Sequence, residues 1–418
     1  MKSSIEWRED AENVTPEERA TVADWRVWLN EINVTQHLDD DVAGDHVTVA
    51  LYGLAHGLVH DWWTIFGSRD RDVSLTKYRS GYLVPNLNFR FDGAVFEIVA
   101  KQHLYKNPDV RFWAGPTEIM LREDGEALLG DLIETVLSRL NALGIRETGA
   151  HLRWRRVQAS RGTAEALFCE AAGGLGLDPY EIDDEAAAFI ENAEGLFEGE
   201  ALVDFVAGAA NVSQSRLLDW VRRMLDDEGS QYRVPELENV VQDTVNASAQ
   251  SRPEAWATGY RRARAMRSVL RLGQTQKFAS FRDIARWLGA GGNYNLAPRV
   301  DGIRALRSQR PDGPQIHLRN HGASAEAEAQ NLFAMARTLG DAACLPDHRL
   351  APINDLRNTW RQAAGRAFAA EFLAPVDEIR SMLEDQHDLI TIADAFAVST
   401  NVIELQIENA ERIDAACA

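Results

Sequence analysis

The chain has few cysteines, no long apolar run and fewer basic than acidic residues. Three cysteines occur in 418 residues, far apart and without a CxxC pair. This excludes a disulfide framework and a cysteine-built zinc site, and it indicates a reducing compartment. No stretch approaches the length of about eighteen apolar residues that a transmembrane helix needs. The first ten residues are charged and lack the apolar core of a signal peptide. We therefore expect a cytoplasmic protein that does not bind a membrane.

The scarcity of basic charge is uneven along the chain. There are 44 Lys and Arg against 64 Asp and Glu, a net charge of −20, which disfavours non-specific binding to nucleic acid. Residues 254–310 are the exception, because twelve basic residues there face three acidic ones. Residues 254–310 therefore carry a net charge of +9, and the rest of the chain carries −29. This segment could pair with the chain's own acidic parts or bind an acidic partner or nucleic acid. Its candidate binding residues are Arg261, Arg262, Arg264, Arg267 and Arg271.

The length predicts two or three domains. With 45% hydrophobic and 26% charged residues, the composition is typical of a globular protein. The sequence patterns predict an α+β multidomain fold. It has a mixed α+β domain over residues 1–150, a helical middle region over 151–250, and a mainly helical domain with a small β-sheet over 251–418.

Local patterns predict individual elements of this fold. The alternation over 45–51 predicts a strand, and 87–100 predicts a β-hairpin. At its centre stands Asp92-Gly93, a pair that favours a type I′ turn. Apolar residues at helical spacing predict a helix over 128–140 that ends before Gly144. Further helices are expected over 163–172, 183–197, 217–225, 260–271, 281–288, 324–339 and 356–373, with a final helix pair from 375, and strands over 302–309 and 314–320.

Two segments of the last domain carry a resemblance to a known family. They read FAMARTLGD over 333–341 and RAFAAEFLAP over 366–375. Together they resemble the core helices of the ImmA/IrrE metallopeptidases, which read close to FTLAHELGH and EANxFAAELLMP. The tail LITIADAFAVSTNVI over 389–403 is similar to the closing helices of that family. The resemblance implies a zincin-like fold for this domain and says nothing about residues 1–250.

The family's chemistry needs two His four residues apart as Zn²⁺ ligands, a Glu between them as general base, and an acidic ligand from the next helix. At the matching positions this chain has Arg337, Thr338, Asp341 and Ala364. Arginine is permanently cationic and has no lone pair for a metal. Threonine cannot act as the base at neutral pH, and alanine offers no ligand. The resemblance therefore implies a peptidase-like scaffold without a catalytic site, metal or cofactor.

The same spacing suggests what replaces the metal. Arg337 and Asp341 are four residues apart and share one helix face, so they could form an ion pair in the vacated pocket. We expect such a pair.

A second pair of histidines has metal-ligand spacing. His56 and His60 lie four residues apart, but Gly57 occupies the middle of the motif, so the general base is again missing. Paired histidines beside tryptophans, here Trp62 and Trp63, are more often packing residues. A zinc site at His56 and His60 is kept as the alternative.

These observations predict a catalytically inactive ImmA/IrrE-like protein that binds another protein as a regulatory, sensor or adaptor subunit. Active members of the family cut or release partner repressors, so the resemblance implies a role in bacterial stress, mobile-element or phage-defence responses. One alternative is a metallopeptidase with a rebuilt site at His56 and His60. Another is a nucleic-acid-associated transcriptional regulator that uses residues 254–310.

Overall fold

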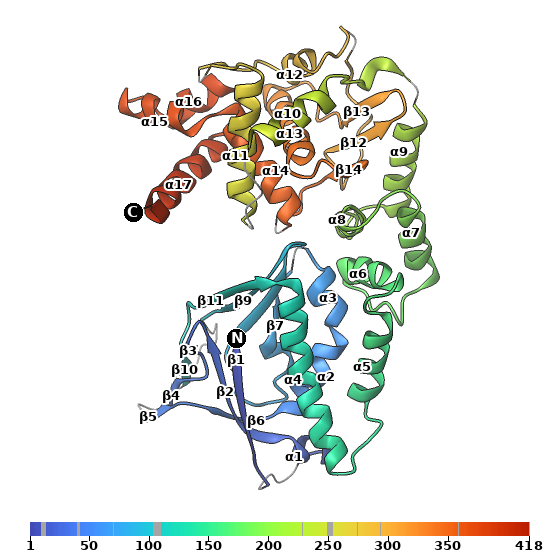
Figure 1. Ribbon diagram of the computed structural model, residues 1–418, viewed down its shortest axis with the longest axis vertical. Helices are drawn as coiled ribbons and strands as arrows, with labels where there is room; N and C mark the ends of the chain where they lie inside the picture. The colour runs from blue at the N-terminus through green and yellow to red at the C-terminus, as the bar shows by residue number, and fades with distance from the viewer. Residues whose placement is uncertain are drawn as a thin grey trace. The chain divides into compact units, whose positions relative to one another are not determined.

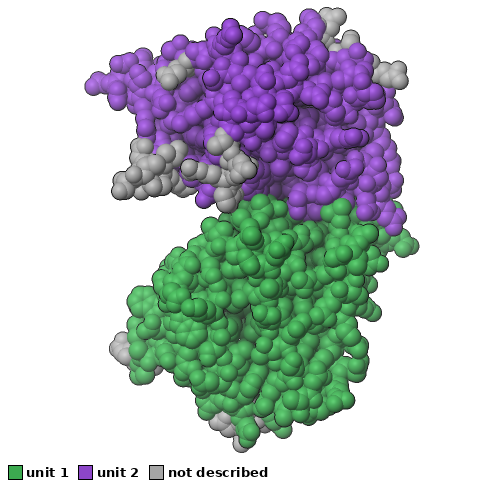
Figure 2. All heavy atoms as spheres, viewed as in Figure 1, with its two compact units in different colours: residues 1–190 green, residues 191–418 purple. Residues whose placement is uncertain are grey.

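The computed structural model describes residues 1–9, 14–39, 42–69, 71–102, 110–227, 229–248, 254–273, 275–292, 294–357 and 359–417. They form two compact units, unit 1 over Met1–Ile190 and unit 2 over Glu191–Ala418 (Figure 2). The mixed α+β class predicted from the sequence is confirmed. Residues 151–250, predicted as one helical region, are divided between the two units.

Unit 1 combines three small antiparallel sheets with helices (Figure 1). The strands are β1 (Lys2–Trp7), β2 (Val22–Leu29), β3 (Ile32–Asn33), β4 (His37–Asp39), β5 (Val42–Gly44), β6 (Val47–Ala50), β7 (Val73–Ser74), β8 (Leu87–Phe91), β9 (Val95–Ala100), β10 (Val110–Phe112) and β11 (Thr117–Leu121). The helices are α1 (Pro16–Ala20), α2 (Leu51–His60), α3 (Trp62–Gly67), α4 (Arg122–Ala142), α5 (Gly149–Ser160) and α6 (Glu165–Leu175), with the 3₁₀ turn η1 (Leu75–Tyr78). Helix α7 (Asp184–Glu194) begins in unit 1 and ends in unit 2. The aromatic rings of Trp62, Phe66 and Phe96 pack together in the core of unit 1.

The predicted hairpin is present as β8 and β9, but its turn differs from the prediction. Phe91 pairs with Phe96 and β9 begins at Val95, so residues 92–94 connect the two strands. Gly93 has a φ of +98°, whereas Asp92 is not among the described residues with positive φ. A type I′ turn requires positive φ at both positions, so that part of the prediction is wrong. The Asp92 carboxylate instead accepts hydrogen bonds from the backbone N–H groups of Ala94 and Val95, each at 2.8 Å.

Unit 2 is mainly helical around one three-stranded antiparallel sheet of order β13-β12-β14 (Figure 1). The strands are β12 (Ala305–Arg310), β13 (Gly313–Leu318) and β14 (Leu350–Ile353). The helices are α8 (Glu200–Gly208), α9 (Gln214–Asp226), α10 (Leu237–Ala247), α11 (Ala255–Val269), α12 (Phe281–Trp287), α13 (Ala325–Cys344), α14 (Trp360–Leu373), α15 (Val376–Glu384), α16 (Leu389–Phe396) and α17 (Thr400–Cys417), with the 3₁₀ turn η2 (Ser230–Tyr232). The final helix pair predicted from residue 375 is thus three helices.

Helix α13 packs against α14 and against all three strands of this sheet. A glycine allows α13 and α14 to approach closely, because a Cβ at Gly340 would lie 2.6 Å from Cβ of Phe368. Helix α11 also approaches α14 closely, because a Cβ at Gly259 of α11 would lie 2.4 Å from the backbone oxygen of Ala364. The ring of Phe368 stacks on that of Phe372 with centroids 5.4 Å apart. These contacts fix residues 337–341 in the interior of unit 2.

Among the described residues, no single helix is long and apolar enough to span a membrane. Helix α16 and the first part of α17 meet the same test only together, as a pair bent by 105°.

Candidate functional site

The positions that match the family's zinc site are all inside unit 2. Arg337, Thr338 and Asp341 lie on α13 with exposures of 6%, 0% and 1%, and Ala364 on α14 is fully buried. The residue of α14 that contacts Asp341 is Arg361, nearly one turn before Ala364. Arg361 is not one of the positions that match the family's site.

Asp341 is held by two arginines from different elements. Arg307 of β12 donates from Nε at 3.2 Å and from Nη2 at 2.9 Å to Oδ2 of Asp341. Arg361 donates from Nε to Oδ1 at 2.5 Å. Burial alone would raise the pKa of Asp341, but Arg361 and Arg307 outweigh it and hold that pKa below its usual value. Both carboxylate oxygens are therefore engaged by guanidinium groups.

Arg337 bonds elsewhere, so the predicted ion pair between Arg337 and Asp341 is wrong. Its Nη2 donates to the backbone oxygen of Asn354 and to Oε1 of Gln362, the latter at 2.9 Å. Its Nη1 lies 3.8 Å from Oδ1 of Asp355. The physical reason is that Arg307 and Arg361 occupy the carboxylate, while the Arg337 guanidinium reaches the segment after β14. Burial lowers the pKa of Arg337 to about 9, which leaves it cationic at neutral pH.

Helix α8 contributes Asp204 to the same group of hydrogen bonds. Gln362 donates from Nε2 to Oδ2 of Asp204 at 3.2 Å and to the backbone oxygen of Pro352 at 3.0 Å. Asn354 donates from Nδ2 to the backbone oxygen of Asp204 at 2.8 Å. We call this group the arginine–aspartate network. Its members are Asp204, Arg307, Arg337, Asp341, Asn354, Arg361 and Gln362.

The network does not fit a zinc ion. A zinc site needs lone pairs directed at one point, and the lone pairs of Asp341 accept from arginines. The hydroxyl of Thr338 donates to the backbone oxygen of Ala334 at 2.8 Å, so it is used within the helix. Arg337 brings a positive charge to the position of the first ligand. Among the residues that the structure describes, no group of three or more His, Cys, Asp or Glu side chains is placed to hold a metal.

The alternative pair, His56 and His60, lies on α2 of unit 1. His56 is exposed and its ring centroid lies 5.8 Å from that of Tyr52. Nδ1 of His60 lies 3.0 Å from Oδ1 of Asp61. The other carboxylate oxygen of Asp61 accepts from Lys77 and from the hydroxyl of Tyr78. The carboxylate beside His60 is therefore already bonded to Lys77 and Tyr78.

The five arginines of the predicted binding surface lie on α11 and just after it. Arg262 and Arg267 are buried and donate to the backbone oxygens of Val245 and Phe372. The prediction is wrong for these two, because they hold α11 against its neighbours instead of facing solvent. Arg264 is exposed, and its Nε donates to Oε1 of the buried Glu371 at 2.6 Å. Arg261 is half-buried, and Arg271 is exposed.

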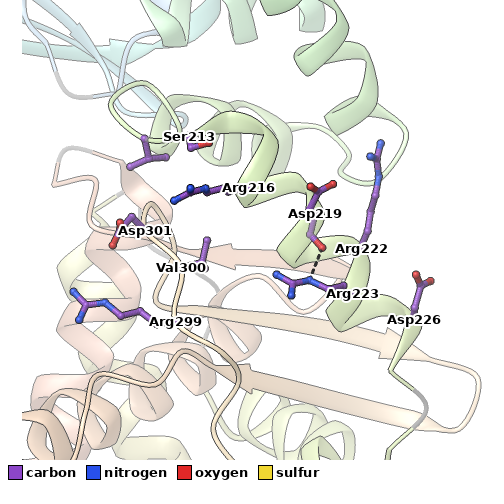
Figure 3. A pocket seen from close by; sticks show the side chains of 10 residues that line it. Ser213, Arg216, Asp219, Arg222, Arg223, Asp226, Arg299, Val300 and Asp301 are labelled. Carbon is purple, nitrogen blue, oxygen red and sulfur yellow. Dashed lines mark hydrogen bonds between the residues drawn. The ribbon is translucent and has the colours of Figure 1, made fainter.

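A groove of about 850 Å³ lies between α9 and the segment 299–301 (Figure 3). Arg216, Arg223, Arg299 and Asp301 are among its lining residues. Figure 3 shows Arg216 lying between α9 and the segment that carries Asp301. No sequence pattern predicts this groove, because its two walls are about eighty residues apart and neither has a recognisable motif.

No protein-family model, curated protein or solved structure matches the chain. The resemblance to the ImmA/IrrE family therefore rests only on the three segments of this chain that carry it, residues 333–341, 366–375 and 389–403.

The lowered pKa of Asp341 predicts a specific pH dependence of stability. A carboxyl group with a lowered folded pKa stabilises the fold fully above its unfolded pKa of about 3.9, and this contribution is lost as the pH falls through the folded pKa. We expect the stability gap between the native protein and Asp341→Asn to be constant at neutral pH and to shrink below about pH 4. Denaturant unfolding of both proteins between pH 7 and pH 3 measures this gap. A gap that widens on acidification would contradict the assignment.

Proposed function

We propose that unit 2 is an ImmA/IrrE-like scaffold that has lost its metal chemistry and acts by binding another protein, as a regulatory, sensor or adaptor subunit. The observation that carries the proposal is the engagement of both oxygens of Asp341 by Arg307 and Arg361. The carboxylate at a ligand position of the family's site is thereby converted into a structural group.

The surrounding contacts support the loss of catalysis. A metallopeptidase needs a base that takes a proton from a metal-bound water. The hydroxyl of Thr338, at the position of that base, bonds within its own helix. Loss of one partner from a buried, hydrogen-bonded ion pair is strongly destabilising, so the contacts of Asp341 with Arg307 and Arg361 resist rearrangement. The contacts of the network therefore favour a structural role for these residues over a catalytic role.

The partner is proposed from the resemblance. Active members of the family act on partner repressors, so we propose that a metal-free relative keeps the binding step and takes part in a bacterial stress or phage-defence response. The basic segment gives less support to nucleic-acid binding, since Arg262 and Arg267 are committed to packing.

Affinity purification of the tagged chain from its source cells, followed by intact-mass analysis of what copurifies, tests this function. We expect one protein to be retained in stoichiometric amount and at full length. A copurifying protein that is cleaved by the native chain but remains whole with Asp341→Asn would contradict a purely binding role. The absence of any stoichiometric partner would contradict the proposal as well.

A further inference from the structure

The groove of about 850 Å³ beside α9 has walls that hydrogen bonds hold in place. Nε1 of Trp220, on α9, donates to the backbone oxygen of Pro298 at 2.8 Å, so it ties one wall to the other. Nη1 of Arg319 donates to the backbone oxygen of Val300 at 2.8 Å and holds the same segment. These bonds lie within unit 2 and need no ligand, so the groove is present before anything binds in it.

Three arginines that line this groove have guanidinium N–H groups without a partner. The guanidinium groups of Arg216 and Arg299 make no hydrogen bond and no ion pair with any residue that the structure describes. Nε of Arg223 donates to the backbone oxygen of Asp219 at 3.3 Å, whereas its Nη groups have no partner in the described part of the chain. All three arginine side chains are exposed, so these donors are accessible to a ligand.

Two of these arginines point into the groove from the same line along α9. Arg216 and Arg223 are seven residues apart, which is about two helical turns and about 10 Å along the helix axis. In Figure 3 both side chains extend from α9 toward the segment 299–301, whereas those of Asp219 and Arg222 extend in another direction. The groove therefore presents two cationic groups, about 10 Å apart along α9, to its interior.

The carboxylates of the groove do not neutralise these arginines. Asp301, on the wall opposite α9, is 75% exposed and lies 3.9 Å from Nη1 of Arg319. Asp219 and Asp226 also line the groove, but neither forms an ion pair with the three arginines among the described residues. The unpaired donors favour an anionic ligand. The three aspartates disfavour a dense polyanion, because they would repel charges that lie between the arginines.

A single-stranded nucleic acid fits this groove less well than an acidic peptide does. Nucleic-acid grooves carry aromatic side chains on which the bases stack, and none of the described residues that line this groove is aromatic. The net charge of −20 also opposes the binding of a polyanion. Side chains three residues apart in an extended, polyproline-type peptide lie on one side and about 9 Å apart. This spacing is close to that of Arg216 and Arg223.

We propose that the groove binds an acidic segment of a partner protein, in which carboxylates about three residues apart bond to Arg216 and Arg223 and a further one contacts Arg299. Guanidinium groups suit carboxylates because their N–H groups match the two carboxylate oxygens. Each exposed ion pair contributes little by itself, so the affinity depends on several of them together. The inference rests on the proposed function in one respect, that the occupant belongs to a protein.

Isothermal titration of the full chain with synthetic peptides at neutral pH and low salt tests the groove. The probe is an end-capped peptide of about ten residues with aspartate at every third position in a glycine–serine background. The matched peptide has asparagine at the same positions. We expect saturable binding of the aspartate peptide, and binding of the asparagine peptide that is weaker by about tenfold or more.

Variants of the chain assign this binding to the groove. The double variant Arg216→Gln/Arg223→Gln should weaken the binding of the aspartate peptide by about tenfold, and Asp301→Asn should tighten it by about threefold because a competing carboxylate is removed. Arg282→Gln/Arg286→Gln, which removes two exposed arginines of α12, is the charge-matched control and should leave the affinity unchanged.

Three results would overturn the proposal. They are the absence of saturable binding of the aspartate peptide, equal loss of affinity in the two double variants, and tighter binding of a single-stranded oligonucleotide of equal charge. Asp301→Asn guards against a folding defect in the groove variant, because it predicts a gain. The peptides are synthetic, so failure here is distinct from failure to copurify a natural partner, which tests the proposed function.

Discussion

Replacing Asp341 by alanine is expected to lower the free energy of unfolding of unit 2 by about 3–5 kcal/mol. The substitution leaves the guanidinium groups of Arg307 and Arg361 buried without the carboxylate that both contact. These side chains are 7% and 4% exposed, so water cannot readily take the place of the carboxylate. Guanidinium chloride unfolding of the native protein and the variant, followed by circular dichroism, measures the difference.

An exposed aspartate on the same unit provides the control for this prediction. Asp394 on α16 is exposed, and its replacement by alanine should change the stability by no more than about 0.5 kcal/mol. If Asp341→Ala were as stable as Asp394→Ala, the network would not be a buried structural element and the proposed role of these residues would fail.

The second large effect is expected at the contact between α13 and α14. Phe368→Ala should cost about 3–5 kcal/mol, because it removes a fully buried ring and leaves a cavity. The cavity would open beside Gly340, where the absence of a side chain admits the ring, and beside the stacked ring of Phe372. The backbone of α13 at Gly340 cannot fill this space without shifting the residues of the network.

Thermal or denaturant unfolding measures this loss, with Trp287→Ala as the control. Trp287 on α12 is 47% exposed, so much of its ring already lies in water and its truncation should cost clearly less than Phe368→Ala. Equal stability of the two variants would show that the α13–α14 contact is not the core of unit 2.

The elements with strong local patterns could be predicted from the sequence, and others could not. Helices α13 and α14 and the hairpin of β8 and β9 were expected from periodicity and turn residues. Helix α10 was missed because the stretch around it is polar, although Leu237, Val240, Val241 and Thr244 place one buried face at helical spacing. Strand β14 has four residues and includes Pro352, so it lacks a recognisable alternation.

For the candidate site, the sequence indicated the helix face but not the partners. The spacing of Arg337 and Asp341 does place them on one helix. Other cations that the fold brings near Asp341 nevertheless compete with Arg337 for its carboxylate. Arg307 and Arg361 are 34 and 20 residues from Asp341, and no local rule connects them. The sequence does mark Arg361 as unusual, because it is a charged residue three positions before Ala364 on a largely apolar helix. This pattern does not indicate that its partner is Asp341.

Elemental analysis of the purified protein, after incubation with zinc and exhaustive dialysis, tests the central claim most directly. Because zinc requires several convergent ligands and Asp341 is engaged by Arg307 and Arg361, we predict a zinc content far below one ion per chain. The content should be the same in Asp341→Asn. Close to one zinc per chain in the native protein, lost in Asp341→Asn, would contradict the account.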